Sequence, residues 1–234
     1  MAEPVNLLRS LAFYVGFYGA SVWLVSHALL VARWAPTKLD PAVRRWARAH
    51  RWCLYHLAGI RVQEEGQQAD HPVIYALRHE SFFEAIDLPG LLNRPAVFAK
   101  RELFDLPGWG RVASAYGLVP VYRDAGASSL RDMLKQAKQR VSDGRPLAIF
   151  PEGTRTPHGV QAPLRPGFVG IYKVTGLAIV PVAVNSGPLY HRWIKRPGTI
   201  TIRFGEPIPP GLPREEVEAR VLAAINVLNG VPAG

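Results

Sequence analysis

The sequence predicts an α/β domain in which helices flank a largely buried sheet, preceded by a helix that attaches the chain to a membrane. Three observations lead to this prediction. The 234 residues are 48% hydrophobic and include 21 glycines and 21 prolines, which suits a single domain-sized core with many connections. Short apolar runs alternate with helical patterns from residue 71 onward. A long apolar run near the start precedes them.

That run, residues 11–31, reads LAFYVGFYGASVWLVSHALLV and has no acidic or basic side chain apart from His27. As a helix it would be about 31 Å long, close to the hydrocarbon thickness of a bilayer. It exceeds the usual length of a signal-peptide core and lacks a clear small-x-small cleavage site, so membrane attachment is favoured. A soluble core helix would need cover on every side. A spanning helix and a half-inserted hairpin both fit the run.

Basic residues follow the apolar run far more often than they precede it. Only Arg9 comes before it, and the residues after it are Arg33, Lys38, Arg44, Arg45, Arg48 and Arg51. By the positive-inside rule the rest of the chain faces the cytoplasm, at the inner membrane if the source is bacterial. Asp40 and Pro41 are typical of a helix start. The basic stripe of that helix suits anionic headgroups or, equally, a solvated face covering the domain.

We therefore expect residues 1–60 to form the membrane anchor with its basic amphipathic helix, and residues 61–234 to form the α/β domain. The net charge of +10 indicates an anionic partner. The single cysteine, Cys53, excludes an intramolecular disulfide and a multi-cysteine metal site. The sequence HES at residue 79 does not continue into H-E-x-x-H, and the chain has no G-x-x-x-x-G-K-[ST] motif. We expect no metal site.

Six runs rich in Val, Ile, Phe and Tyr are the expected strands. They cover residues 72–77, 96–100, 118–122, 147–150, 179–184 and 199–204. Helical periodicity is clearest over residues 129–141 and recurs over residues 214–228.

His79 and Glu84 lie five residues apart where the first of these strands ends. On an ideal helix, five residues turn through about 500°, so the two side chains would point about 140° apart. They can meet if His79 lies on the loop leaving the strand and Glu84 lies in the next helix. A carboxylate on one ring nitrogen would leave the other to take a proton from a hydroxyl. A purely structural pair has the same spacing, so this pattern alone is weak.

The segment AIFPEGTRT, residues 148–156, breaks a second strand at Pro151. It presents Glu152, Gly153, Thr154 and Arg155 at the strand end, where ligands bind in open α/β sheets. Gly153 permits a tight turn, and the planar guanidinium of Arg155 suits a phosphate. Ser81 also lies near His79, but no G-x-S-x-G elbow surrounds it, so we expect a helix cap rather than a nucleophile.

Together these segments resemble the glycerolipid acyltransferases, specifically the PlsC-like 1-acylglycerol-3-phosphate acyltransferases. The third signature of that family, F-P-E-G-T-R, is present letter for letter at residues 150–155. KRELFDLPGWGRVASAYGLVPVYR resembles the second signature, residues 180–182 match the V-P-V signature, and LRPG resembles the K-P-G turn. The match runs in order from about residue 72 to residue 187. One departure is plain, because Glu84 stands where the H-x4-D signature has aspartate.

The resemblance implies a mixed, largely buried sheet of the glycerolipid acyltransferase type and acyl transfer from a thioester to the sn-2 hydroxyl of lysophosphatidate. His79 would be the general base and Glu84 would orient it. The substrate-binding residues implied are Lys100, Arg123, Glu152, Gly153, Thr154 and Arg155. No cofactor or metal is implied; acyl carrier protein or coenzyme A brings the acyl group as co-substrate. The partners implied are a membrane lipid acceptor and an anionic membrane surface, without nucleic acid.

Two alternatives stay open at this point. The same chemistry could serve another lysolipid acceptor, such as lyso-ornithine lipid. A chain of a different class would be a non-catalytic basic membrane-binding module that uses only its charge and its anchor.

Overall fold

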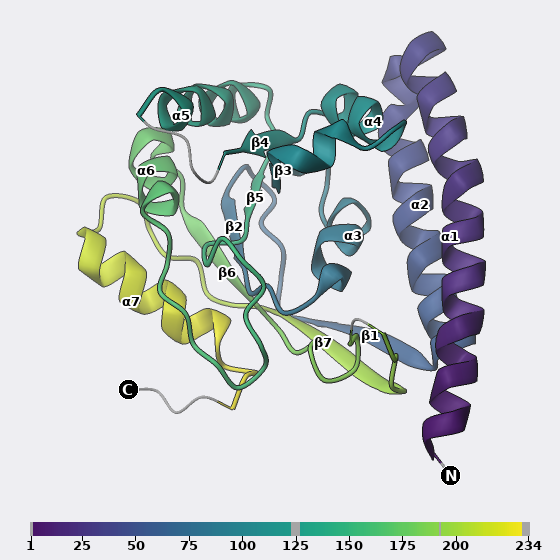
Figure 1. Cartoon of the computed structure of the whole chain (residues 1–234). Helices are drawn as coiled ribbons and strands as arrows, with labels where there is room; N and C mark the ends of the chain where they lie inside the picture. Colours follow the sequence, from purple (N-terminus) through teal and green to yellow (C-terminus); the bar gives the residue numbers. More distant parts are fainter. Residues whose placement is uncertain (1, 123–126, 192, 231–234) are drawn as a thin grey trace.

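A computed structural model describes residues 2–122, 127–191 and 193–230. This part of the chain forms a seven-stranded sheet in the order β1-β7-β6-β2-β5-β3-β4, with helices on both faces (Figure 1). Neighbouring strands run parallel except β6 and β7, which are antiparallel. The prediction of a mixed sheet flanked by helices is confirmed.

The strands are β1 (Ile60–Glu65), β2 (Ile74–Leu77), β3 (Ala96–Lys100), β4 (Val119–Val121), β5 (Leu147–Ile149), β6 (Ile179–Val184) and β7 (Gly198–Phe204). The helices are α1 (Ala2–Trp34), α2 (Leu39–Cys53), α3 (Phe82–Leu91), α4 (Trp109–Tyr116), α5 (Ala127–Ser142), α6 (Pro166–Thr175) and α7 (Arg214–Ile225). All six expected strands are present. The strand that the sequence analysis missed is β1, whose IRVQEE sequence is largely polar because it lies at the sheet edge beside β7.

Strand β2 is buried on both faces, as expected for a central strand in a parallel region. Its side chains alternate between two cores. Tyr75 and Leu77 belong to the core that also holds residues of α1, α2 and α3. Ile74 and Ala76 belong to the opposite core, beneath α5, α6 and α7. The end of β2 is therefore held rigidly between two packed layers.

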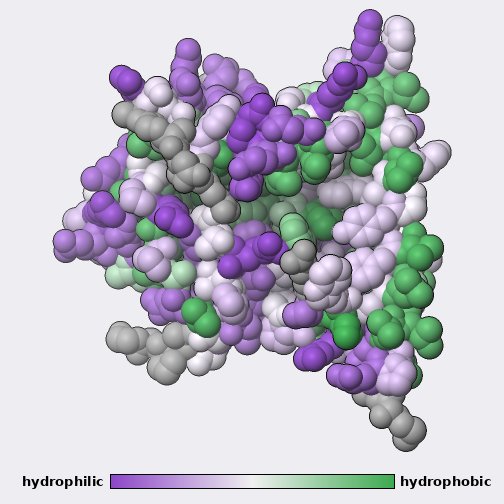
Figure 2. Space-filling model, in the orientation of Figure 1, coloured by the Kyte–Doolittle hydropathy of each residue, from purple (hydrophilic) through white to green (hydrophobic). Residues whose placement is uncertain are grey.

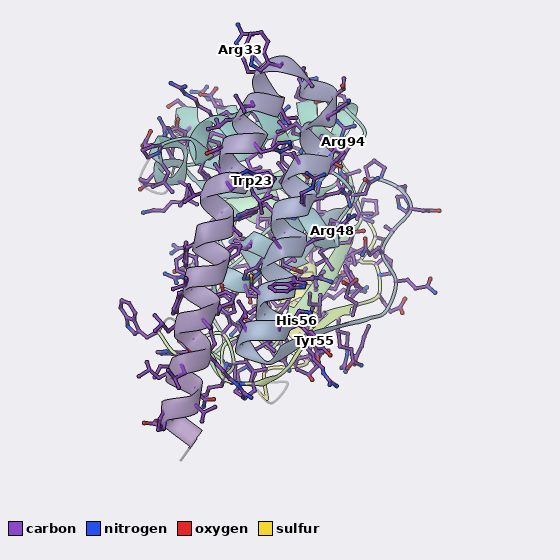
Figure 3. All side chains as sticks on the ribbon, turned by 90° about the vertical axis from the view of Figure 1, so that its right-hand side faces the viewer. Trp23, Arg33, Arg48, Tyr55, His56 and Arg94 are labelled. Carbon is purple, nitrogen blue, oxygen red and sulfur yellow. The ribbon has the colours of Figure 1, made fainter. Side chains whose placement is uncertain are left out.

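Helix α1 is long and apolar enough to cross a membrane by length and composition, and it lies alongside α2 (Figures 1 and 3). Its inward face packs on the protein and is not available to lipid, because Phe13 and Phe17 are fully buried in the main core. Its outward face exposes a stripe of large apolar side chains, seen as the green band along the right of Figure 2. This stripe includes Leu8, Leu11, Val15, Tyr18, Val22, Trp23 and Leu30.

Helix α2 uses part of its basic stripe to contact the domain. Arg51 forms a bidentate pair with Asp87 of α3, with distances of 2.6 and 2.7 Å, and Arg44 donates to the carbonyl of Leu92 at 3.1 Å. Arg48, labelled in Figure 3, is exposed. The stripe therefore divides between ion pairs that fasten α2 to the domain and side chains that face outward.

Candidate active site

Three loops leave the sheet at the same edge because β2 runs parallel to both of its neighbours, β5 and β6. The loop after β2 carries His79, the loop after β5 carries the FPEGTR turn, and the loop after β6 carries Ser186. The sheet topology thus gathers residues that are far apart in sequence. Figure 2 shows a hollow with hydrophobic atoms on its floor near the centre of the molecule, where Figure 1 places α3.

A capping box at the start of α3 positions Glu84. The Ser81 Oγ accepts a hydrogen bond from Phe83 N at 3.1 Å, and Glu84 Oε2 accepts one from Ser81 N at 2.9 Å. The same Oε2 atom lies 3.0 Å from His79 Nδ1. His79 lies on the loop and Glu84 in the first turn of the helix, which is how a five-residue spacing brings the two groups together.

The other oxygen of Glu84 is held by two serine hydroxyls. Ser186 donates a short hydrogen bond to Glu84 Oε1, and Ser81 Oγ lies 3.4 Å from the same oxygen and 2.7 Å from Ser186 Oγ. The carboxylate is 3% exposed, so its orientation depends on these protein partners rather than on water. Ser186 was not predicted as a site residue, although its position just after the V-P-V strand put it at the same edge of the sheet as His79.

The imidazole of His79 is held by a stacking contact on one face and by the contact of Nδ1 with Glu84. Its ring stacks on Phe150 with centroids 4.0 Å apart and an interplanar angle of 22°. With Nδ1 directed at the carboxylate, Nε2 is the nitrogen that can receive a proton. The side chain is 15% exposed, which leaves a narrow approach for a substrate.

The FPEGTR turn is fastened to the backbone of His79. Glu152 Oε2 accepts from His79 N at 3.2 Å, and Thr156 N donates to the His79 carbonyl at 2.7 Å. Glu152 is 1% exposed, and its other oxygen forms a short ion pair with Arg78. Burial raises the pKa of Glu152, an effect that the charge of Arg78 opposes. Glu152 therefore has a structural role, in which it links the FPEGTR turn to the backbone of His79 and to the side chain of Arg78.

Gly153 and Arg155 shape the outer part of the turn. Gly153 has φ +68°, and a Cβ there would lie 2.7 Å from Arg165 Cγ, so the turn needs glycine. Thr154 is exposed. Arg155 is exposed and its Cζ lies 4.1 Å from the ring centroid of Phe82, the first residue of α3. This cation–π contact keeps the guanidinium beside the helix start, near the His79 loop.

Lys100, another residue of the expected substrate-binding set, lies farther along the sheet from this cluster. Lys100 ends β3, two strands from β2, and its ammonium lies 3.0 Å from Glu102. Arg123 lies outside the described residues.

A second histidine–glutamate pair lies beside the first and was missed by the sequence analysis. Glu80 Oε1 lies 3.0 Å from His158 Nδ1, and Glu80 Oε2 accepts from Gly187 N at 2.7 Å. Burial raises the pKa of Glu80, which the contacts with Gly187 and His158 oppose. The adjacency of Glu80 to His79 was the available signal. Among the described residues no three His, Cys, Asp or Glu side chains are arranged to hold a metal ion.

Comparison with known proteins identifies the family of the chain. A family model described as Acyltransferase matches residues 59–185. The chain belongs to the acyltransferase family. The matched residues contain His79, Glu84, the FPEGTR turn and the end of β6, so the family match covers every loop of the candidate site except the part beyond residue 185.

Two named relatives and one solved structure are similar to this chain. A 1-acyl-sn-glycerol-3-phosphate acyltransferase of Pseudomonas aeruginosa is 26% identical over 230 residues, covering 96% of this chain and 88% of that protein. The 1-acyl-sn-glycerol-3-phosphate acyltransferase beta of Homo sapiens is 28% identical over 159 residues, covering 66% of this chain and 57% of that protein. The crystal structure of the 1-acyl-sn-glycerophosphate (LPA) acyltransferase PlsC from Thermotoga maritima superposes with a TM-score of 0.72 at 24% identity. That superposition covers 96% of this chain and 95% of the other, and it supports the fold.

Proposed function

We propose that this acyltransferase moves an acyl chain from an acyl thioester to the sn-2 hydroxyl of lysophosphatidate, giving phosphatidate. The observation that carries the proposal is the 3.0 Å contact between His79 Nδ1 and the buried Glu84 carboxylate, beside a turn that carries Arg155. The names of the relatives supply the acceptor. Either acyl carrier protein or coenzyme A would carry the thioester.

His79 acts as the general base in this proposal, and Glu84 orients it. His79 Nε2 takes the proton of the acceptor hydroxyl as that oxygen attacks the thioester carbonyl carbon. The tetrahedral intermediate then collapses: the C–S bond breaks, the new ester remains, and the proton on Nε2 passes to the departing thiolate. The fixed carboxylate of Glu84 stabilises the imidazolium that forms between the two steps.

The acceptor's phosphate would bind at the exposed guanidinium of Arg155, with Arg123 and Lys100 as further candidates. A guanidinium fork offers paired donors to phosphate oxygens. The hydrophobic floor of the hollow in Figure 2 offers acyl chains a surface away from water.

The exposed apolar stripe of α1 would attach the enzyme to the membrane that holds its acceptor, with the catalytic domain on the cytoplasmic side. Burial of a side chain such as Val22, 72% exposed on this stripe, in the bilayer interface lowers the free energy of the membrane-bound state. The buried inner face of α1 favours a helix that lies on or partly in the bilayer.

The test is an assay of the purified full chain in detergent or vesicles, with lysophosphatidate as acceptor and with acyl carrier protein and coenzyme A thioesters as donors. Mass spectrometry should identify phosphatidate as the product. His79→Ala should lose turnover while keeping its fold and its membrane binding. If lyso-ornithine lipid is acylated and lysophosphatidate is not, the acceptor assignment is wrong. If His79→Ala keeps full turnover, the base assignment is wrong.

A further inference from the structure

We propose that Arg78 is a positioning residue for the acyl transfer: its buried guanidinium clamps both ends of the segment that carries Arg155 and so sets the geometry between base and acceptor. This proposal rests on the proposed function. Arg78 has no part in the proton transfer itself, and the sequence analysis assigned it no role. It acts through Glu152 and through the backbone of residues 157–160.

The side chain of Arg78 is 0% exposed, and its two terminal nitrogens donate to oxygens of the segment that follows β5. Nη1 forms the short pair with Glu152 Oε1. Nη2 donates to the carbonyl of Pro157 at 3.0 Å and to that of Val160 at 2.6 Å. Nε lies 3.6 Å from Glu80 Oε1. One side chain therefore contacts the segment before Arg155 and again after it.

The backbone of Arg78 is fixed by the sheet. Arg78 N donates to the carbonyl of Val182 at 2.9 Å, which continues the pairing of β2 with β6 to the residue before His79. The far end is also tied, because Gly159 N donates to Asn229 Oδ1 at 2.9 Å. In Figure 1 the segment between β5 and α6 descends past α7 before it returns, so this long excursion depends on such ties.

The geometry requires a guanidinium. Only a planar fork can reach a carboxylate and two carbonyls in different directions while carrying the charge that Glu152 needs. An apolar residue at position 78 would leave the buried carboxylate of Glu152 without its cation, which is strongly unfavourable. Glu152 also accepts from His79 N, so its displacement would move the base as well as the turn.

Arg145 provides a matched control because it is another buried arginine with backbone acceptors. It is 6% exposed and donates to the carbonyls of Arg94, Tyr116 and Pro95 at 2.9, 2.8 and 2.8 Å. These acceptors lie around the start of β3 and the end of α4, away from the His79 loop. Losing Arg145 should therefore weaken folding without disturbing the active-site segment.

The experiment compares purified full-length Arg78→Met, Arg78→Lys and Arg145→Met with the wild type, using thermal unfolding and steady-state kinetics below all transition temperatures. Both methionine variants should unfold at lower temperature. Only Arg78→Met should lose turnover, by about 100-fold, since a small misplacement of reacting groups costs that much. Its KM for lysophosphatidate should rise while its KM for the thioester stays unchanged. Arg78→Lys should restore part of the turnover, and Glu152→Gln should resemble Arg78→Met.

Hydrogen exchange gives a readout that does not depend on activity. Amides of residues 150–165 should exchange faster in Arg78→Met, and those of α5 should not. Wild-type exchange over residues 150–165, or equal turnover in Arg78→Met and Arg145→Met, would overturn the proposal. If Arg78→Met does not fold, Arg78→Lys and Glu152→Gln decide by the same criteria. A wild type that acylates no lysophosphatidate would instead contradict the proposed function, and the exchange experiment would still decide the clamp.

Discussion

Glu84 Oε2 contacts both the backbone N–H of Ser81 and the Nδ1 atom of His79, at 2.9 and 3.0 Å. A single carboxylate oxygen therefore closes the capping box of α3 and orients the imidazole. The helix start and the proposed catalytic pair are one structural unit, and a substitution at Glu84 changes both.

Glu84→Gln should keep the shape of the side chain and remove its charge. Turnover should fall by about 100-fold because the imidazolium formed during transfer loses its counter-charge and the imidazole loses its fixed tautomer. Steady-state kinetics with circular dichroism as the check on folding would measure this. Wild-type turnover in this variant would mean that another acid orients His79.

Ser186→Ala should lower turnover less than Glu84→Gln does, because the carboxylate remains but loses its buried hydroxyl donor. The loss of that hydrogen bond should cost about 1–3 kcal/mol in the free energy of unfolding. Ser26→Ala, which removes an exposed hydroxyl bonded to the Val22 carbonyl, is the matched control. Equal urea midpoints and equal turnover for the two variants would contradict the role given to Ser186.

Arg155→Ala should raise the KM for lysophosphatidate by about 10-fold or more, as expected when a charge-assisted hydrogen bond is lost. The KM for the thioester should change little. Arg131→Ala, an exposed arginine on α5, controls for the general loss of positive charge. A similar rise in KM for both substrates would argue against a phosphate site at Arg155.

His50 predicts a pH dependence of stability. Burial, followed by the charges of Lys195 and Arg51, lowers the pKa of His50 from 6.5 to about 3. Between these two values the unfolded chain binds a proton that the folded protein does not, so stability falls as pH drops through this window. The slope from this one group is at most about 1.4 kcal/mol per pH unit. Denaturant unfolding at a series of pH values should show that the free energy of unfolding falls less steeply with decreasing pH in His50→Gln than in the wild type. Equal slopes would refute this account.

The apolar stripe of α1 should mediate membrane binding. Leu8, Val15 and Val22 recur every seven residues on one face and are 67, 68 and 72% exposed. Replacing all three with serine should weaken binding to vesicles by well over 10-fold, since each buried aliphatic side chain contributes about 1.5–3 kcal/mol. Serine at Leu130, Val160 and Val227, which are exposed elsewhere in the chain, is the control. Cosedimentation that is unchanged relative to this control would exclude the stripe as the binding surface.

The sequence predicted the central strands and the pairing of His79 with Glu84 because both follow from local rules. Apolar runs mark buried strands. Because a helix begins shortly after the strand ends, two residues five positions apart can contact each other there only if the first lies on the loop and the second in the helix. Strand β1 was missed because its edge position removes the apolar pattern. The assignment of residues 1–60 to a membrane anchor with a basic amphipathic helix, and of residues 61–234 to the α/β domain, stays a prediction.

The parts of the site contributed by other loops could not be read from one sequence. Ser186 and Glu84 are 102 residues apart, and His158 and Glu80 are 78 apart. Only the strand order brings these residues together, and that order is not encoded in any local pattern. Arg78 was overlooked for a different reason, because an arginine at a strand end usually indicates solvent exposure, whereas here glutamates and carbonyls surround it.

The buried inner face of α1 bears on how this enzyme can be produced. Deleting the N-terminal helix is a common way to make such a protein easier to handle in water. Here the deletion would take Phe13 and Phe17 out of the main core and strip the cover from His50 and Tyr190, which contact the Phe13 ring. A shortened version should aggregate rather than dissolve, so detergent or lipid nanodiscs around the intact chain are the better route to an active preparation.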